Sequence, residues 1–295
     1  MKAVRTISRI QLKNILFATD FSPVAAAALP FAAQLAQTYE ARLFAVHAKS
    51  PENYALPTAG IGLAADAQVE ELAIELRRNM YNRYPRVETD VLVVEGGVWG
   101  VVSAVADEKQ ADLIVVGTNG RQGIGKFILG SVAEEILRRA TCPVLTVGPH
   151  CPAASKGAAT FKKILYATDF GESSPAAAAY AVALAQEHEA HLTLLHVIAS
   201  PRAGELVRPP ELEAAALERL RTFVSDDAQL WCEPRAIVAH GDPAEEILAT
   251  AEKERADLIV LGLRNTKGVG RATHLPMAVA HKVVSQATCP VLTVR

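Results

Sequence analysis

The chain has 295 residues, with 30 Lys and Arg against 32 Asp and Glu and a formal net charge of −2. This length is enough for about two domains of ordinary size. Half of the residues are hydrophobic, so each domain can bury its own core. The balanced charge gives no indication of a general attraction to nucleic acid or to anionic membranes. No run approaches the roughly 18 consecutive apolar residues of a membrane-spanning helix. We therefore expect neither nucleic acid nor a membrane as a partner.

The first ten residues carry three basic side chains but no apolar segment after them, so we expect a basic leader without fixed structure rather than a secretory signal. The cysteines are too few and too scattered for a disulfide framework, and no Cys-x-x-Cys pair is present. This usage favours a reducing cytoplasm. We expect Cys151 to be the most exposed of the four, which are Cys142, Cys151, Cys232 and Cys289.

Four sequence blocks occur twice in the same order, which indicates a duplicated domain. The pairs are NILFATDFS at 14–22 and KILYATDFG at 163–171, LFAVH at 43–47 and LTLLH at 192–196, ADLIVVG at 111–117 and ADLIVLG at 256–262, and ATCPVLTV at 140–147 and 287–294. Between the copies, a stretch rich in Pro, Gly, Ala and Ser reads as a linker. We expect domains at 1–148 and 162–295, joined by a linker at 149–161.

Within the first copy, short apolar runs alternate with longer helical patterns. Ser22 is expected as the N-cap of the first helix, with Pro23 at its first position. In chain order we expect strand 15–18, helix 23–39, strand 43–48, an irregular loop at 49–62, helix 65–84, strand 87–94, helix 98–109, strand 113–116, helix 131–139 and strand 144–147. This alternation predicts an α/β fold with a parallel, doubly wound sheet, whose ligands bind at the carboxyl ends of the strands.

The segment after the fourth strand has the spacing of a phosphate-binding loop. Gly117 and Gly120 allow a sharp turn and a close approach of the backbone to a ligand, and Gly130 does the same where the next helix begins. Ser131 and the amide of Val132 then stand at a helix N-terminus, which favours phosphate. A β-turn followed by a helix cap is the simpler alternative.

Two further features bear on this site. Asp20, at the tip of the first strand, would face the same crevice, where a carboxylate can accept a ribose hydroxyl or hold a metal beside the phosphates. Arg121 and Lys126 lie in the loop and could neutralise phosphate charge, although solvated loop charges are an equal alternative.

The spacing Gly-x-x-Gly, nine residues, Gly-Ser resembles the ATP-binding signature of the universal stress protein family, and the ATD and CPVLTV blocks resemble that family as well. The resemblance covers essentially the whole chain, twice. It implies two tandem, doubly wound, parallel five-stranded sheets of strand order 3-2-1-4-5, of the adenine nucleotide alpha hydrolase-like kind. It also implies ATP as the cofactor, with or without Mg. The implied binding residues are Asp20, Ala48, Gly117, Gly120, Gly130, Ser131 and Val132. The family usually has Val where this chain has Ala48, which matters little for a main-chain contact.

The second copy lacks this loop. After Gly262 the next glycine is replaced, and alignment through the shared ATCP block places Met277 at the position of Gly130 and Ala278 at that of Ser131. Asp169 and Val197 survive, so the nucleoside end could persist. We predict no ATP, or much weaker binding, in the second copy. Two other residues could serve a different ligand, although surface positions are the stronger interpretation: Arg264 and His274.

Histidines offer two further candidate features. His188 and His191 form an HxxH pair, for which a solvated helix end is favoured over a metal site. His47 and His196 hold matched positions at the end of the second strand, which indicates a shared structural role rather than catalysis. We therefore assign no catalytic residue and no protein-held metal.

Three function classes remain open. The leading hypothesis is a cytoplasmic, ATP-binding protein of stress response or signalling, with one ATP per chain in the first domain. The enzymatic alternative is slow Mg-dependent ATP hydrolysis, or autophosphorylation on a hydroxyl such as that of Ser131. The third is an interaction or ligand-carrying scaffold that works through the second domain. The resemblance also implies pairing of the two domains through their final strands, and it leaves a homodimer open.

Overall fold

The computed structural model describes residues 10–49, 59–118, 129–151, 160–199, 210–224, 234–263 and 274–295. The chain divides into two compact units, residues 11–151 and residues 160–295 within this description, and each is treated by itself. The expected basic leader, Cys232 and most of the expected linker lie outside the described residues.

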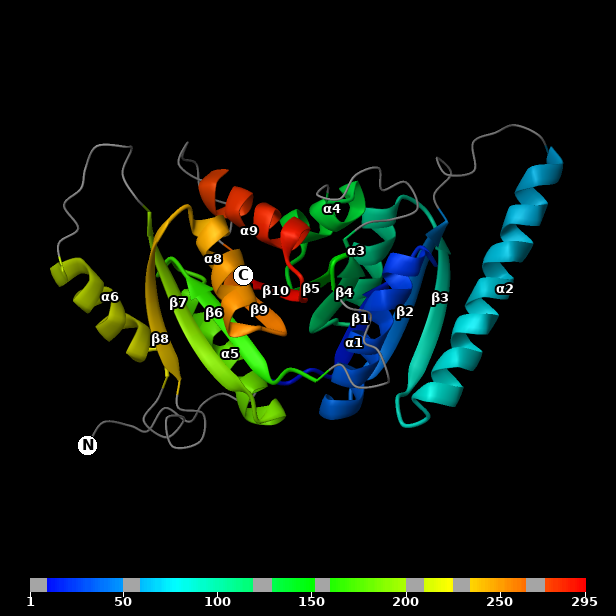
Figure 1. Ribbon diagram of the computed structural model, residues 1–295. Helices are drawn as coiled ribbons and strands as arrows, with labels where there is room; N and C mark the ends of the chain where they lie inside the picture. The colour runs from blue at the N-terminus through cyan, green and yellow to red at the C-terminus, as the bar shows by residue number, and fades with distance from the viewer. Residues whose placement is uncertain are drawn as a thin grey trace. The chain divides into compact units, whose positions relative to one another are not determined.

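The first unit alternates strands and helices along the chain (Figure 1). Its elements are β1 (Asn14–Ala18), α1 (Pro23–Tyr39), β2 (Arg42–Lys49), α2 (Ala59–Arg83), β3 (Thr89–Glu95), α3 (Val98–Glu108), β4 (Leu113–Gly117), α4 (Ser131–Arg139) and β5 (Val144–Val147). The strands lie in the order β3-β2-β1-β4-β5, and every neighbouring pair is parallel. This is the doubly wound α/β fold that the sequence predicts.

The second unit repeats that plan. Its elements are β6 (Lys163–Thr168), α5 (Ser174–His188), β7 (His191–Ala199), α6 (Pro210–Arg221), β8 (Arg235–Gly241), α8 (Pro243–Glu254), β9 (Leu258–Gly262), α9 (His274–Gln286) and β10 (Val291–Val294). The strand order is β8-β7-β6-β9-β10, again with parallel neighbours. The two copies therefore share one topology, as the repeated blocks require.

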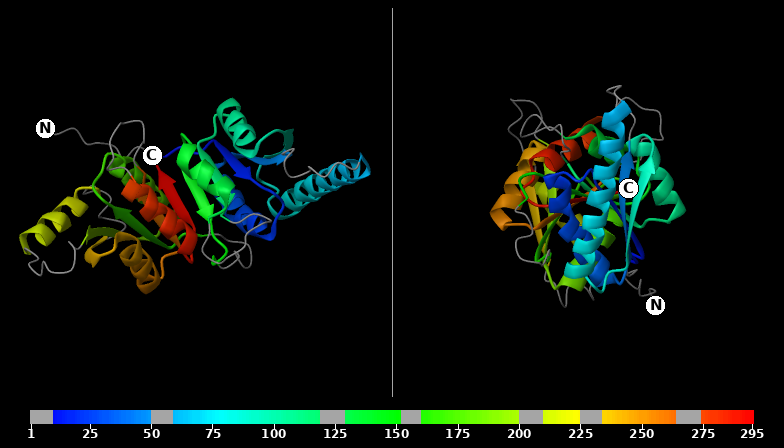
Figure 2. Two further views of the ribbon diagram at one scale, coloured as in Figure 1. Left: turned by 90° about the horizontal axis from the view of Figure 1, so that it is seen from above. Right: turned by 90° about the vertical axis from the view of Figure 1, so that its right-hand side faces the viewer.

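Helices cover both faces of each sheet. In the first unit α1 and α2 lie on one face of the sheet and α3 and α4 on the other. In the second unit α5 and α6 lie on one face and α8 and α9 on the other (Figure 2). This follows from right-handed crossovers, because the direction of travel across the sheet reverses after the third strand of each unit. The central strands β1, β4, β6 and β9 are accordingly buried along nearly their whole length.

The boundaries of the first helices show what local sequence decides. The Ser22 side chain accepts a hydrogen bond from the Ala25 amide, and Pro23 opens α1, so the predicted cap is confirmed. The start of α2 was misplaced, because the helix begins at Ala59 inside the loop expected at 49–62. Both prolines of that segment precede the helix, whereas its glycines at 60 and 62 lie in the first turn, where they weaken a helix without ending it.

Cys151 corrects another expectation. Its amide donates to the carbonyl of Gly148 in a turn after β5, and the residue is only 7% exposed. Burial raises the pKa of the Cys151 thiol to about 11. Cys142 is more exposed, so the prediction that Cys151 is the most accessible cysteine was wrong. A linker sequence without periodicity does not reveal that one of its side chains is enclosed.

His188 also differs from expectation. It is the last residue of α5 and its ring is buried edge-on against Phe161, 5.2 Å between ring centroids, instead of lying at a solvated helix end. The Nε2 atom is buried and has no hydrogen-bond partner among the described residues. Desolvation lowers the pKa of His188 below its ordinary value. His191, three residues on, is exposed at the start of β7.

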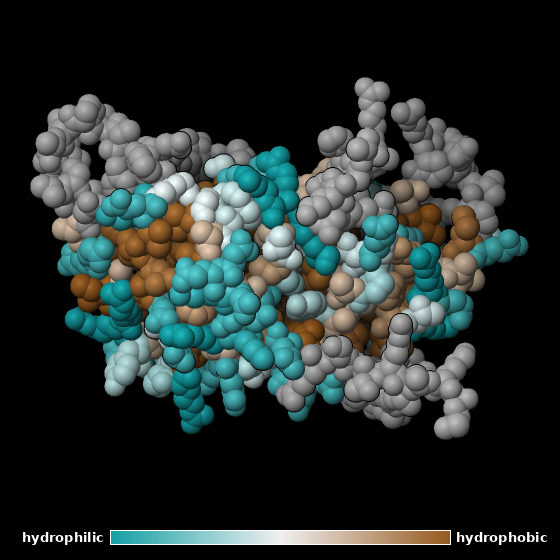
Figure 3. Space-filling model, turned by 180° about the vertical axis from the view of Figure 1, so that it is seen from behind, coloured by the Kyte–Doolittle hydropathy of each residue, from teal (hydrophilic) through white to brown (hydrophobic). Residues whose placement is uncertain are grey.

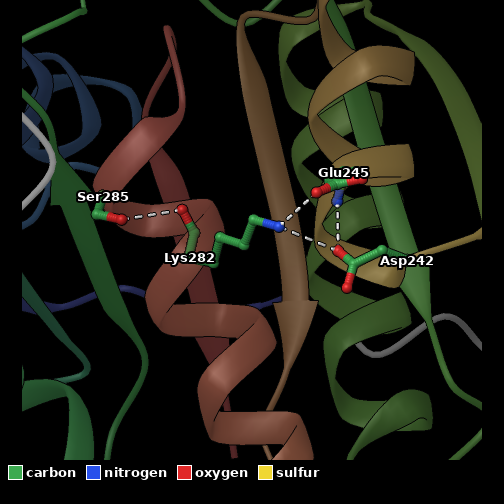
Figure 4. A network of polar contacts seen from close by, with 4 residues as sticks. All are labelled: Asp242, Glu245, Lys282 and Ser285. Atoms are coloured by element: carbon green, nitrogen blue, oxygen red, sulfur yellow. Dashed lines mark hydrogen bonds and ion pairs between the residues drawn. The ribbon is translucent and has the colours of Figure 1, made fainter.

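A salt-bridge network joins two helices of the second unit (Figure 4). Lys282 of α9 reaches Glu245 Oε1 at 2.9 Å and Asp242 Oδ1 at 3.3 Å. Asp242 is the N-cap of α8 and accepts from the Glu245 amide, which is the main reason why its pKa is lowered. These side chains are exposed, so the network orients α9 against α8 while contributing little stability.

The face drawn in Figure 3 carries apolar side chains in patches among hydrophilic ones. The large hydrophobic side chains exposed within the described ranges are Ile74, Tyr81 and Leu212. Across the same ranges, no helix combines the length and the apolar character needed to cross a membrane.

The neutral burial of His188 predicts a pH effect on stability. The unfolded chain protonates this ring below about pH 6.5, whereas the folded state resists protonation until a lower pH, so unfolding takes up protons. The free energy of unfolding should therefore decrease as the pH falls below about 6.5. In His188→Phe, the plot of this free energy against pH should be less steep, because unfolding then takes up as much as one proton fewer. Denaturant unfolding at a series of pH values measures this. Equal slopes for wild type and His188→Phe would contradict the prediction.

Candidate functional site

The carboxyl ends of three strands meet at one level in the first unit. Ala18 at the end of β1 pairs with Val46 of β2 and with Val116 of β4. Gly117 follows Val116 directly, and both Asp20 and Ala48 lie two residues beyond their paired positions. The structure thus brings Asp20, Ala48 and Gly117 to the same edge of the sheet, where ligands of such folds bind.

The chain leaving β1 turns sharply, and its side chains hold that turn. Thr19 Oγ1 accepts from the Phe21 amide at 3.0 Å and Asp20 Oδ1 accepts from the Ser22 amide at 2.9 Å. Phe21 has a φ of 58°, an uncommon conformation for a bulky residue. Asp20 therefore has a structural role that sequence reasoning missed.

The second unit builds the same turn. Thr168 Oγ1 accepts from the Phe170 amide, Asp169 Oδ1 accepts from the Gly171 amide, and Phe170 has a φ of 60°. The repetition of ATDF in both copies was the available signal. It reflects backbone geometry in addition to any ligand contact.

His47 and His196 confirm the expectation of a shared structural role. The Nδ1 atom of His47 lies 2.9 Å from the carbonyl oxygen of Thr19, and that of His196 lies 2.8 Å from the equivalent carbonyl of Thr168. Each ring packs on the phenylalanine of its turn, Phe21 at 4.7 Å or Phe170 at 4.2 Å. The histidine thus ties the end of the second strand to the turn that carries the aspartate.

The ends of the phosphate-type loop meet beside β4. Thr118, which is buried, donates from its amide to Val147 at 3.0 Å, and its carbonyl accepts from the amide of Gly130 at 2.6 Å. Sequence reasoning missed Thr118, whose position between two glycines gave no signal. The loop between these ends, with Gly120, Arg121 and Lys126, lies outside the described residues.

α4 begins directly at the base of this loop. Gly130 is its N-cap residue, with extended backbone angles and no side-chain cap, and the first helical residue, Ser131, is exposed. The first backbone N–H groups of any helix have no partner within that helix. The amides of Ser131 and Val132 therefore stand where an anion could accept from them.

In the second unit the corresponding helix begins one turn earlier. Ala278 aligns with Ser131, yet α9 starts at His274, four residues before it, although both helices end at aligned residues. The amides at Met277 and Ala278 consequently lie inside the helix, past its unpaired first turn. The side chain of His274, and Arg264 as a whole, lie outside the described residues.

The base of the second loop is also closed differently. The amide of Leu263 donates a hydrogen bond to the carbonyl of Val294 at 2.7 Å, as the amide of Thr118 does to the carbonyl of Val147. The carbonyl of Leu263 accepts from the hydroxyl of Ser173, the N-cap residue of α5. Among the described residues, the base of the second loop is thus in contact with the start of α5.

Aromatic packing surrounds the strand-end turn of the second unit. Arg219, in α6, lies over the Phe170 ring at 4.4 Å and donates to the Phe170 carbonyl. Phe223 stacks on the same ring, with centroids 6.1 Å apart, and meets Tyr166 edge-on. Phe170 follows Asp169 directly, so this cluster adds bulk at the end where a nucleoside would lie.

The site offers groups for an anion and for hydroxyls. The described part of the chain contains no group of three or more His, Cys, Asp or Glu side chains that could hold a metal ion. The carboxylate of Asp20 and the α4 N-terminus lie at the same end of the first sheet. A phosphate ester with hydroxyl groups would match both.

Gly117 has a packing role that leads to a prediction. A Cβ there would lie 3.1 Å from the carbonyl oxygen of Val24 and 3.2 Å from the Ala25 amide, in the first turn of α1. Gly262 is placed similarly, with its closest contacts to Ser173 at 3.3 Å. Gly117→Ala should destabilise the fold by about 1–3 kcal/mol through overpacking, and Gly262→Ala should cost less. Calorimetric unfolding checks both variants, and a rise in Tm for Gly117→Ala would contradict the packing role.

Comparisons with known proteins agree with this architecture. The model of the universal stress protein family matches residues 11–148 and again residues 160–295. A universal stress protein of Thermus aquaticus is 41% identical over 140 residues, covering 46% of this chain and 99% of the relative. One from Methanocaldococcus jannaschii is 31% identical over 140 residues, covering 46% of this chain and 81% of the relative.

A solved structure extends the similarity to both units. The crystal structure of a universal stress protein from Archaeoglobus fulgidus superimposes with a TM-score of 0.69 at 19% identity, covering 97% of this chain and 99% of that chain. At this identity the likeness speaks for the fold alone. Together with the double family match, it leads to one conclusion. The chain belongs to the universal stress protein family and carries the family's domain twice.

Proposed function

We propose that the first unit binds ATP, that each chain binds one nucleotide, and that this nucleotide regulates a stress-response or signalling function in the cytoplasm. The observation that supports this most is the difference between the two helices after the fourth strand of each unit. α4 starts at Ser131, where the loop closes, whereas α9 starts four residues before the aligned position.

The proposed roles follow the positions at the sheet edge. The carboxylate of Asp20 accepts from a ribose hydroxyl, and the backbone of Ala48 contacts the adenine. Phosphate oxygens accept hydrogen bonds from the first amides of α4 and from the hydroxyl of Ser131, because a helix N-terminus attracts negative charge. The residues of this phosphate half are Gly117, Gly120, Gly130, Ser131 and Val132.

Magnesium enters this proposal with the nucleotide, as a companion of its phosphates. Slow ATP hydrolysis and autophosphorylation at Ser131 remain alternatives, since Ser131 is exposed beside the proposed phosphates. Regulation by binding alone requires no positioned base or nucleophile, and His47, a nearby titratable ring, is engaged with Thr19.

Titration calorimetry of the nucleotide-free chain with Mg-ATP tests this proposal. We expect one site per chain. Ser131→Ala removes a hydrogen bond to a charged group, and Gly130→Met places the second unit's residue at the loop base. Each change should weaken binding about tenfold or more. Release of phosphate measured on the same samples would reveal turnover.

The matched control lies in the second unit. Met277→Gly combined with Ala278→Ser restores the residues of the first loop, but these positions remain inside α9. The stoichiometry should therefore stay at one. A second site in this variant would show that side chains, and not the helix start, decide binding. Absence of binding to the wild type would refute the proposal and leave the scaffold hypothesis.

We also propose that β5 and β10 pair within one chain. Each is the last strand in the order of its own unit, and the two have the same sequence, VLTV. An uncovered end strand exposes unpaired N–H groups, which proteins avoid. Amides of β5 that face away from β4 should then exchange slowly with deuterium, equally at low and high protein concentration. Fast exchange would exclude pairing, and protection only at high concentration would indicate a homodimer instead.

A further inference from the structure

The second unit has an open hollow at the amino end of its sheet, far from the strand ends discussed above. Its volume is about 400 Å³, and it is lined by the first residues of β6, β7 and β8 and by the end of α8. Strands of this length separate the two ends by roughly 20 Å. Close packing of side chains leaves few hollows of this size.

The repeat shows which residue of the first unit corresponds to a lining residue of the hollow. Phe44 of β2 pairs with Leu16 of β1, and Thr193 of β7 pairs in the same register with Leu165 of β6. The two residues are therefore structural equivalents. Phe44 is 3% exposed and fills its place with a ring, whereas Thr193 has only a hydroxyl and a methyl group. Thr193 thus lacks the ring that Phe44 supplies, at a position that lines the hollow.

The first unit also shows what kind of group this position accepts. The guanidinium of Arg42 lies 5.3 Å from the centroid of the Phe44 ring, and the ammonium of Lys109 lies 5.8 Å from it. Both distances are within the range of cation–π attraction. An aromatic ring thus fits this position in the first unit, where the two neighbouring cations stand at the places of His191 and Glu254 in the second unit.

The charges around the hollow differ from those of the first unit. Arg235 stands where β3 has Asp90, and Glu254 stands where α3 is followed by Lys109. Arg235 Nη1 lies 3.0 and 3.1 Å from the two carboxylate oxygens of Glu254. Lys163 replaces a neutral asparagine, so two cations, one carboxylate and the ring of His191 line the hollow. This excess of positive charge favours an anion.

Arg235 has donors to spare for such an anion. Both of its bonds to Glu254 come from Nη1, and a guanidinium carries five N–H donors in a fork that suits carboxylates. Its side chain is 63% exposed, against 20% for Glu254. A ligand entering from solvent would therefore meet the guanidinium before the carboxylate.

We propose that this hollow binds a small aromatic carboxylate. The ring lies over Leu165 and Thr193, in the place that Phe44 fills in the first unit. The carboxylate lies between Lys163 and Arg235. The site does not depend on the proposed nucleotide site, because it is built from other residues and belongs to the other unit.

Titration of the full-length chain with 3-phenylpropionate tests this, with backbone amide shifts read by NMR. We expect saturable shifts at residues 163, 193 and 235 and a dissociation constant of about 1 mM, ordinary for a ligand of this size. Thr193→Phe restores the ring of the first unit and should weaken binding at least about tenfold. Thr193→Val keeps the space open and should bind as the wild type does.

The charge requirement has its own controls. Lys163→Asn introduces the residue of the first unit and should weaken 3-phenylpropionate several-fold, with little effect on the neutral 3-phenyl-1-propanol. This variant changes an exposed side chain, so it decides the matter if Thr193→Phe folds poorly. The proposal is overturned if no saturable shift occurs, if Thr193→Phe binds unchanged, or if the alcohol binds as tightly as the acid.

Discussion

The unpaired amides at a helix start are the constraint on which the difference between the two units depends. A helix exposes free N–H groups only in its first turn, so moving its start by one turn, about 5.4 Å, removes them from their former place. α4 begins at Ser131 after a glycine, whereas α9 begins four residues before the aligned Ala278. Both helices end at aligned residues. The sheet can therefore stay the same while the capacity to hold a phosphate changes.

The parts common to both units are those that hold the backbone in place. The Asp112 carboxylate accepts hydrogen bonds from the amides of Lys13 and Asn14 at the start of β1. The Asp257 carboxylate accepts them from the amides of Lys162 and Lys163 at the start of β6. At the other end of those strands, a threonine, an aspartate and a histidine fix the turn in both copies. A copy that lost these contacts would lose hydrogen bonds that fix both ends of its first strand, whereas a change in loop glycines leaves them in place.

Most of the fold could be predicted from the sequence, because the repeated blocks fall on buried strands whose apolar runs are unambiguous. The starts of α1 and α4 were also predictable, since Ser22 and Pro23 mark the first and Gly130 marks the second. Three features were not. The start of α2 depends on weak glycine preferences. The burial of Cys151 and His188 depends on tertiary contacts, such as that with Phe161, which lie outside any local pattern. For the site, the structure brings Asp20, Ala48 and Gly117 to one edge of the sheet and gives Asp20 a structural role that the sequence did not reveal, while the binding roles stay predictions.

Duplication also relaxes the two ends of the sheet independently. A single-domain protein must keep both its ligand loop and its packing intact, but a second copy is free to change either. At the carboxyl end, Arg219 and Phe223 now pack on Phe170, so aromatic side chains take space beside Asp169. At the amino end the reverse holds, because Thr193 lacks the ring that Phe44 supplies in the first unit. These differences leave the parallel register of the first two strands the same in both units.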